Sequence, residues 1–311
     1  MSNCDATNFG NLTRRDFLRA TSVIGAAFGL NAAGLLDFGS EAEAKETAAG
    51  GIPVLWLQGQ ACSGCSVSLL NSIFYTTIDD LAVNTLDINF HPNLSAAAGN
   101  LAVAQIERTY RQGGYVMVFE GAIPTGSGGA FCNLWPGMTY QKAVERYTER
   151  AAYILAVGTC ASFGGIAAAA PNPTGAQGLA ASYGGKTVIK ISGCPVHPDW
   201  IVGTVAYILA NGAAPALDSY GRPTMFYGRR LHGDWCPLYE TNKATQPGQG
   251  GCTRGIGCKG PVSNCDCNSR LWNASAVGGK GVNWCSGTGA TCIGCSEPTF
   301  PDGMTPFYSI P

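Results

Sequence analysis

Cysteine is the residue type whose number and spacing point most directly to chemistry in this chain. The sequence holds 14 cysteines and only 3 histidines among its 311 residues. Many cysteines in an exported protein usually form disulfides, but a chain of this length can build a core that needs few covalent cross-links. The spacing of the cysteines therefore has to distinguish disulfides from metal ligands.

Four cysteines in the first two thirds of the chain come after apolar stretches. Cys62 and Cys65 form a C-x-x-C pair after the stretch that ends at Leu57, and Cys160 and Cys194 follow two later stretches. Ligands of open α/β sheets bind beyond the carboxyl ends of the strands, so we expect these thiols to meet there. Four thiolates match a 4Fe–4S cluster, although zinc would accept the same set. A helix beginning after Cys65 and the abundance of glycine favour the bulky, anionic cluster.

A second and denser group of candidate ligands occupies the C-terminal third. Eight cysteines and one histidine fall within the 64 residues from 232 to 295. We interpret the histidine as a ligand, because it lies four positions from a cysteine and imidazole can replace thiolate at iron. The candidates are His232, Cys236, Cys252, Cys258, Cys265, Cys267, Cys285, Cys292 and Cys295. The other two histidines, His91 and His197, stand beside prolines without a cluster of cysteines, and we interpret both as structural.

The first four cysteines must be positioned by the strands and helices around them. Short apolar runs predict strands at 53–57, 86–90, 115–119, 153–157 and 187–191. Helical patterns lie between them, at 66–78, 100–111, 139–150 and 199–210. Strands rich in Val, Ile and Leu that alternate with helices predict an α/β fold with a parallel, doubly wound sheet. After Gly221 the chain is rich in Gly, Cys, Pro and Trp and lacks periodicity, so we expect metal clusters to act as its scaffold.

Charge and composition restrict the class of partner. The formal net charge is −1, with 19 basic and 20 acidic residues, and no basic stripe is present to neutralise phosphates, so nucleic acid is excluded as a partner. Charged residues make up 13% of the chain, compared with about 25% in ordinary soluble domains. This low fraction indicates that a broad face is buried against another protein.

The first 44 residues have the pattern of a twin-arginine export signal. Arg14 and Arg15 precede an uncharged stretch at 20–36, and the small residues Ala42 and Ala44 predict cleavage near Lys45, which would remove Cys4. An amphipathic N-terminal helix is the alternative, whereas Asn31 interrupts the stretch too early for a membrane span. Because this route exports folded proteins, clusters can be assembled in the reducing cytoplasm first.

Taken together, these residues resemble the small subunit of nickel–iron hydrogenases over nearly the whole chain after the signal. The matching stretches are WLQGQACSGCS at 56–66, GTCA at 158–161, GCPVHPDW at 193–200, GCKGP at 257–261, VNW at 282–284 and CIGCSEP at 292–298. The resemblance implies a flavodoxin-like domain over 52–215 that carries one cluster. It also implies a domain over 216–311 with two further clusters and little regular secondary structure.

By position, the resemblance assigns three ligand groups, each for a 4Fe–4S cluster. The proximal group is Cys62, Cys65, Cys160 and Cys194. The distal group is His232, Cys236, Cys252 and Cys258. The medial group is Cys267, Cys285, Cys292 and Cys295. Cys132 and Cys265 are left without a role, and the alternative for the distal group is that Cys265 completes it in place of His232.

Three positions depart from the common pattern of the family. Cys285 stands where many members have proline and a 3Fe–4S medial cluster, and it resembles the selenium-containing branch; if Cys285 is not a ligand, the medial cluster is 3Fe–4S. Three residues separate His232 from Cys236, where the family usually has two. Gly64 and Gly165 replace the extra cysteines of oxygen-tolerant members, which implies an ordinary proximal cluster.

The implied function is electron transfer in a periplasmic hydrogenase. Hydrogen would react in a separate large subunit, and electrons would pass from the proximal to the medial to the distal cluster and on to a carrier such as a cytochrome. This chain would contribute no catalytic residue and would meet a membrane only through a partner. The alternatives are a free-standing exported polyferredoxin and a secreted binding protein stabilised by zinc or disulfides. The cluster-bearing subunit of complex I shares only the first four cysteines.

Overall fold

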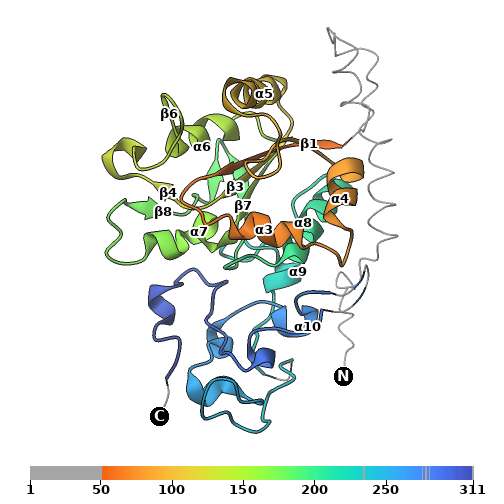
Figure 1. The fold of residues 1–311 in the computed structure, drawn as a ribbon, viewed down its shortest axis with the longest axis vertical. Coiled ribbons are helices and arrows are strands. Elements are labelled where there is room, and N and C mark those ends of the chain that lie inside the picture. Colours follow the sequence, from red (N-terminus) through yellow and green to blue (C-terminus); the bar gives the residue numbers. More distant parts are fainter. Residues whose placement is uncertain (1–50, 234, 275, 277–278, 280, 310–311) are drawn as a thin grey trace.

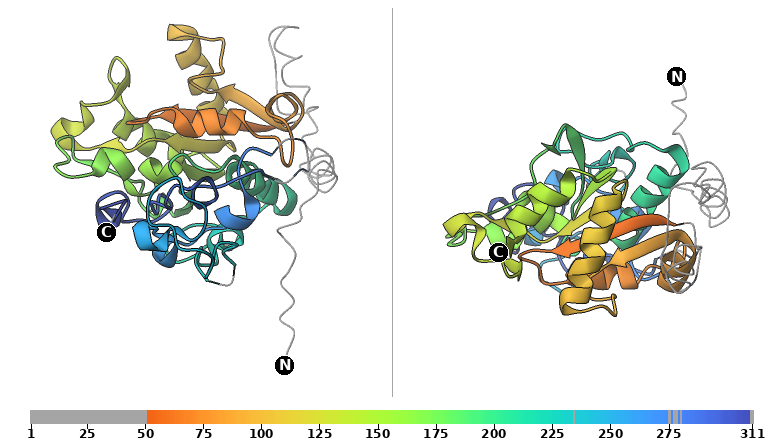
Figure 2. Two further views of the ribbon diagram at one scale, coloured as in Figure 1. Left: turned by 60° about the horizontal axis from the view of Figure 1, so that its bottom comes forward. Right: turned by 90° about the horizontal axis from the view of Figure 1, so that it is seen from above.

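A computed structural model describes residues 51–311, except 234, 275, 277, 278, 280, 310 and 311. The expected export signal and Cys4 lie outside the described residues. An α/β part forms the upper portion of the view in Figure 1, and the C-terminal segment lies below it. The left view of Figure 2 has the same order, with the C-terminal segment on one side of the sheet.

The centre of the α/β part is a six-stranded sheet with the strand order β2-β1-β3-β7-β10-β9. The first five strands are parallel to one another, and β9 pairs antiparallel with β10 at the edge. Their bounds are β1 (Ile52–Gln58), β2 (Leu86–Phe90), β3 (Val116–Glu120), β7 (Tyr153–Val157), β9 (Ser182–Tyr183) and β10 (Lys186–Ile191). The parallel strands follow the flavodoxin order, and the predicted α/β fold is confirmed.

Helices cover both faces of this sheet, which explains why its strands are apolar on both sides. Val54 and Trp56 of β1 face one core, whereas Leu55 and Leu57 face the other. The first core is closed by α3 (Gly64–Leu70), α4 (Ile78–Asp80) and α8 (Pro198–Asn211). The second core is closed by α5 (Gly99–Gln112), α6 (Tyr140–Thr148) and α7 (Gly158–Phe163).

The helix predicted at 66–78 is wrong in its second half. α3 ends at Leu70, and helical structure returns only with α4 and a π turn at Leu81–Thr85. The intervening residues 73–77 are aromatic or β-branched, and these residue types lose side-chain freedom in a helix. Tyr75 and Thr76 are buried instead, and the Ser72 hydroxyl donates to the Thr76 carbonyl over 3.1 Å.

Short elements complete the α/β part. Two small antiparallel sheets pair β4 (Ile123–Pro124) with β8 (Ala176–Gln177) and β5 (Asn133–Trp135) with β6 (Met138–Thr139). Two 3₁₀ turns lie at Gly126–Gly129 and Gly165–Ala168. The sequence analysis did not find these elements or α7, because each is too short to show a period.

The C-terminal segment has little regular secondary structure, as expected. It contains α9 (Thr224–Tyr227), α10 (Cys267–Arg270) and four 3₁₀ turns at Thr253–Ile256, Gly260–Val262, Ser286–Thr288 and Asp302–Met304. Phe226, Tyr227, Leu231, Cys265 and Trp284 join the core that lies under α8, so the segment packs on that face of the sheet. Among the described residues, no helix has both the length and the apolar character that a membrane crossing needs.

A buried arginine holds the beginning of the C-terminal segment against its later turns. The side chain of Arg222 is only 1% exposed. It donates to Asp218 over 2.8 Å, to the Ser296 carbonyl over 3.0 Å and to Glu297 over 3.2 Å. Glu297 also accepts the backbone N–H of Asn264 over 2.6 Å, so one pair of charges connects three stretches of chain.

Replacing Arg222 with methionine is expected to lower the free energy of unfolding by about 3–5 kcal/mol, because it leaves buried carboxylates without their counter-ion. Denaturant unfolding of the purified protein measures the effect. Arg146→Met is the control: it breaks the pair with Glu107, whose side chains are 41% and 26% exposed, and should cost below about 1 kcal/mol. Equal losses of unfolding free energy in the two variants would show that Arg222 stabilises the segment no more than an exposed ion pair does.

Candidate metal-binding sites

The proximal group lies at the carboxyl edge of the sheet. Cys62 and Cys65 follow β1, Cys160 lies in α7 directly after β7, and Cys194 follows β10. Burial and the neighbouring Glu120 raise the pKa of the Cys65 thiol, and Cys160 and Cys194 add to the increase. Burial, followed by Cys160 and Cys62, raises the pKa of Cys194 to about 11. The structure therefore brings these four cysteines to one edge of the sheet, where their thiols influence the pKa values of one another.

Glycines keep the space around these thiols open. Gly158 has a φ of +87°, and a Cβ there would lie 2.5 Å from the Cys65 sulfur. A Cβ on Gly165 would lie 2.9 Å from the Cys160 sulfur. The backbone N–H of Gly64 approaches the Cys62 sulfur at 3.4 Å and can donate to a thiolate there. Backbone groups instead of side chains thus surround the sulfurs, as a bulky ligand requires.

Glu120 is a residue of this site that the sequence analysis missed. It ends β3, is 2% exposed, and accepts the backbone N–H groups of Cys65 at 3.1 Å and Ser66 at 3.3 Å. Its other oxygen accepts from the Trp56 indole at 3.0 Å and from the Ser66 hydroxyl. A carboxylate at the start of α3 satisfies free helix N–H groups and orients Cys65. Its signal in the sequence was a single charge that ends an otherwise apolar run.

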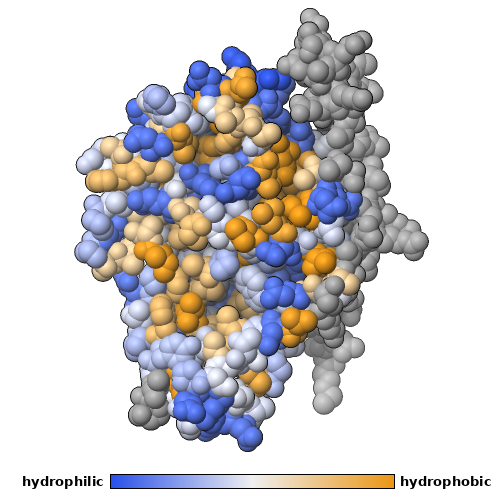
Figure 3. Space-filling view, viewed as in Figure 1, coloured by the Kyte–Doolittle hydropathy of each residue, from blue (hydrophilic) through white to orange (hydrophobic). Residues whose placement is uncertain are grey.

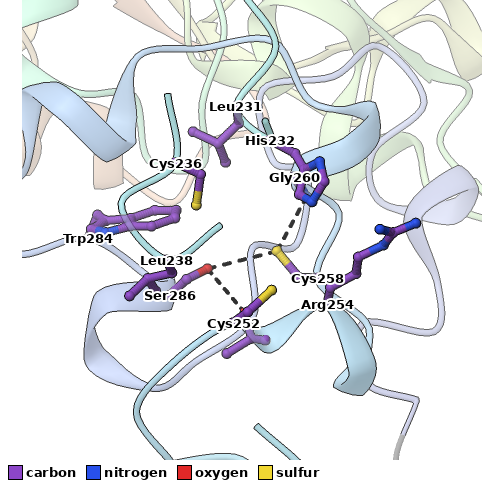
Figure 4. A pocket seen from close by; sticks show the side chains of 11 residues that line it. Leu231, His232, Cys236, Leu238, Cys252, Arg254, Cys258, Gly260, Trp284 and Ser286 are labelled. Atoms are coloured by element: carbon purple, nitrogen blue, oxygen red, sulfur yellow. Dashed lines mark hydrogen bonds between the residues drawn. The ribbon is translucent and has the colours of Figure 1, made fainter. Parts of the chain in front are cut away.

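The distal group lines one cavity in the C-terminal segment. His232, Cys236, Cys252 and Cys258 all contribute to its wall. Figure 4 shows the three sulfurs and the imidazole turned toward the same space, with Trp284 and Leu238 on one side and Arg254 on another. The backbone N–H of Gly260 approaches the Cys258 sulfur at 3.4 Å. The unusual spacing between His232 and Cys236 therefore does not separate their side chains.

The medial group comes together around a fifth cysteine. A hydrogen bond with Cys265, followed by burial, raises the pKa of Cys267. Burial, followed by Cys265, raises the pKa of Cys285 and raises that of Cys295 to about 12. The distal thiol of Cys258, followed by burial, raises the pKa of Cys292, and Cys265 and Cys295 add to the increase. Cys265, which the sequence left without a role, is itself buried among the medial thiols.

The two histidines interpreted as structural and Cys132 belong to none of the three groups. His91 is buried beside the Ser66 hydroxyl at 3.2 Å, its ring lies tilted 4.8 Å from that of Trp56, and it accepts from the backbone N–H of Asn93. His197 caps α8 and pairs with the Leu271 carbonyl at 2.8 Å. Burial lowers the pKa of both histidines to about 4. Cys132 belongs to the core on the opposite face of the sheet, where burial raises its pKa.

The chemistry of the donors fits iron–sulfur clusters. All 13 cysteines in the described part of the chain are free thiols, which contradicts the disulfide alternative there. No three His, Cys, Asp or Glu side chains of the described residues are placed to hold a single metal ion. Buried thiols with raised pKa values are neutral near pH 7, and a bound metal centre replaces their protons. Soft thiolates with one imidazole are ligands that iron–sulfur clusters accept.

Two family models match the chain in succession. Residues 62–208 match the NADH ubiquinone oxidoreductase 20 Kd subunit, and residues 227–308 match the C-terminal part of the NiFe/NiFeSe hydrogenase small subunit. The first match contains the proximal group, and the second contains the medial and distal groups. Together, the two matches define a subunit of an electron-transferring oxidoreductase.

Relatives extend the match over almost the whole chain. The periplasmic NiFeSe hydrogenase small subunit of Desulfomicrobium baculatum is 34% identical over 96% of this chain and 99% of its own. The periplasmic NiFe hydrogenase small subunit 1 of Nitratidesulfovibrio vulgaris is 35% identical over 96% of this chain and 93% of its own. The solved NiFeSe hydrogenase of Desulfovibrio vulgaris Hildenborough superposes with a TM-score of 0.75 at 38% identity, covering 83% of this chain and 98% of that one.

The chain belongs to the small subunits of nickel–iron hydrogenases, which are the electron-transferring subunits of these oxidoreductases. Membership implies a hydrogenase large subunit as its partner. The family resemblance predicted from the sequence is confirmed.

Glu120→Gln is expected to lower the free energy of unfolding by about 3 kcal/mol, because an amide nitrogen cannot accept the donors that the carboxylate binds. Glu145→Gln is the control, since Glu145 is exposed on α6 and its change should stay within about 0.5 kcal/mol. Denaturant unfolding measures both. A Glu120 variant as stable as the Glu145 variant would refute the positioning of Cys65 by this carboxylate.

Proposed function

We propose that the chain holds three 4Fe–4S clusters, one in each ligand group. The proximal cluster would be held by Cys62, Cys65, Cys160 and Cys194. The distal cluster would be held by His232, Cys236, Cys252 and Cys258, and the medial cluster by Cys267, Cys285, Cys292 and Cys295. Each group supplies four donors of kinds that iron accepts. The medial cluster would be 3Fe–4S only if Cys285 is not a ligand.

Contacts between the groups are the observation that carries this proposal. The hydroxyl of Thr159, directly before the proximal Cys160, donates to the backbone carbonyl of Cys295 in the medial group. At the other end, the backbone N–H of Lys259, directly after the distal Cys258, donates to the carbonyl of the medial Cys292 over 2.7 Å. Cys292 and Cys295 belong to one C-x-x-C turn, so a single short segment touches both neighbours. This order supports a relay from the proximal through the medial to the distal group.

The function that fits this order is electron transfer between a hydrogen-activating nickel–iron site in the large subunit and an external redox carrier, such as a cytochrome. Bound clusters would supply the one-electron chemistry. The chain's own residues hold the thiolates, place backbone N–H groups beside them and exclude water. No side chain of this subunit is assigned to the breaking of hydrogen.

The large subunit would cover the proximal edge of the sheet. α3, which carries Cys65, exposes Val67 at 54% and Leu70 at 38%. Figure 3 shows apolar side chains gathered across the middle of the face on which α3 lies in Figure 1. Exposed apolar patches of this kind mark protein interfaces. They support a broad contact on this side, which leaves the distal group for the carrier.

We place the assembly in the periplasm, after export by the twin-arginine route. The relatives named above are periplasmic proteins, and residues 1–44 have the pattern of such a signal. Residues 52–215 and 216–311 would then be the two domains of the exported chain.

The purified complex should contain about twelve irons in this subunit and a co-purifying large subunit. Gly158→Ala should lose about four of these irons, because its Cβ would occupy space at the Cys65 sulfur. Gly212→Ala is the control: Gly212 also has a positive φ, of +61°, but a Cβ there meets nothing within 4 Å. Metal and sulfide analysis measures all three proteins. Zinc in place of iron, or only four irons in the unsubstituted protein, would contradict the proposal, and a stable iron-containing monomer would favour the free-standing carrier.

Cys285→Pro should convert the medial cluster to the 3Fe–4S form. Cys285 has a φ of −48°, close to the value that proline imposes, so the change removes a thiol without opposing the backbone. The oxidised variant should gain a nearly isotropic EPR signal, and the medial potential should rise. A stoichiometric 3Fe–4S signal in the unsubstituted protein would show that Cys285 is not a ligand.

A further inference from the structure

A threonine hydroxyl lies between the proximal and medial groups. Thr159 is the second residue of α7, directly before Cys160, and is 1% exposed. Its hydroxyl donates to the backbone carbonyl of Cys295 in the medial group. The same hydroxyl accepts the backbone N–H of Gly193 over 2.9 Å, and Gly193 directly precedes Cys194. One buried oxygen therefore contacts segments that carry ligands of both groups.

The backbone of Thr159 strengthens this arrangement. Its N–H donates to the Gly193 carbonyl over 2.9 Å, so Thr159 binds Gly193 through both its main chain and its side chain. The spacing between Cys160 and Cys194 is fixed as a result. A parallel contact joins the neighbouring residues: the hydroxyl of Ser192, directly before Gly193, donates to the carbonyl of Ser296, directly after Cys295, over 2.7 Å. The turn that carries Cys295 is thus attached directly to the proximal ligand loops.

We propose that Thr159 is a positioning residue that fixes the medial ligand Cys295 against the proximal ligand loops and thereby sets electron transfer between the two clusters. This inference rests on the proposed function. The hydroxyl holds the Cys295 turn against the loop that carries Gly193 and Cys194. Hydrogen bonds around the ligands of a cluster tune its reduction potential. Groups that orient metal ligands also change activity when they are mutated. Loss of the hydroxyl therefore removes a hydrogen-bond donor from the backbone of a medial ligand. This disfavours the more negative, reduced form of the medial cluster and lowers its reduction potential.

Thr159→Val tests this role, because it replaces the hydroxyl with a methyl group of similar size. In the holoenzyme we expect full iron and sulfide content and a lower reduction potential of the medial cluster, measured by redox titration with EPR detection. Electron delivery to an external acceptor should fall roughly 10–100-fold. Hydrogen–deuterium exchange at the large subunit should be unchanged, since it needs no transfer through this chain.

Two further variants and a control separate this role from a purely structural one. Thr159→Ser keeps the hydroxyl and should restore both the potential and the rate. Thr159→Ala removes the hydroxyl without adding bulk, so it must give the same shift as valine and decides the matter if valine disturbs assembly. Thr148→Val is the control, because Thr148 is 2% exposed and its hydroxyl donates only within its own helix α6, to the carbonyls of Val144 and Glu145.

The outcomes distinguish this inference from the function on which it rests. An unchanged potential and rate in both Thr159→Val and Thr159→Ala overturn the inference alone. A shift that Thr159→Ser does not reverse, or that Thr148→Val reproduces, also overturns it. An unsubstituted protein without iron overturns the proposed function, and the inference falls with it.

Discussion

The rest of this structure depends on one constraint, which is the cost of burying several thiolates close to one another. Burial disfavours thiolates and neighbouring thiolates repel one another, so the pKa values of Cys65, Cys194 and Cys295 all rise. A bound metal cluster would remove both penalties at once. The free energy of metal binding would then become part of the free energy of folding, because the unfolded chain offers no such site. A C-terminal segment with only short helices and turns is consistent with a scaffold of this kind.

The two parts of the chain position their ligands by different physical means. At the proximal site, hydrogen-bonded parallel strands end at one edge, so the sheet itself brings distant cysteines together. In the C-terminal segment, ligands come from turns whose backbone groups bond across the chain, such as the N–H of Lys259 to the Cys292 carbonyl over 2.7 Å. Residues 295 and 296 connect these two systems, because their carbonyls accept the hydroxyls of Thr159 and Ser192.

The sequence predicted those features that residue type determines locally. The parallel strands are short runs rich in apolar residues, and all five were predicted within a residue or two of their bounds. The three cysteine sets were proposed because thiolates are the usual ligands of iron–sulfur clusters. Features that depend on distant partners were not predicted. The helix break after Leu70 follows from the burial of Tyr75. Glu120 gains its role only when α3 packs against the end of β3. The position of Cys265 among the medial thiols likewise could be seen only in the folded structure.

The spacing at His232 illustrates why ligand motifs are specified by backbone geometry and not by residue count. An additional residue before Cys236 would rotate one ligand away if the chain were regular. Here Gly233 takes a φ of +119°, which other residues rarely adopt, and the N–H of Cys236 donates back to its carbonyl over 2.8 Å. This turn absorbs the additional residue, and the imidazole meets Tyr239 edge-on at 4.9 Å. A glycine in the loop thus lets both side chains reach one cavity, which a fixed-spacing motif would have excluded.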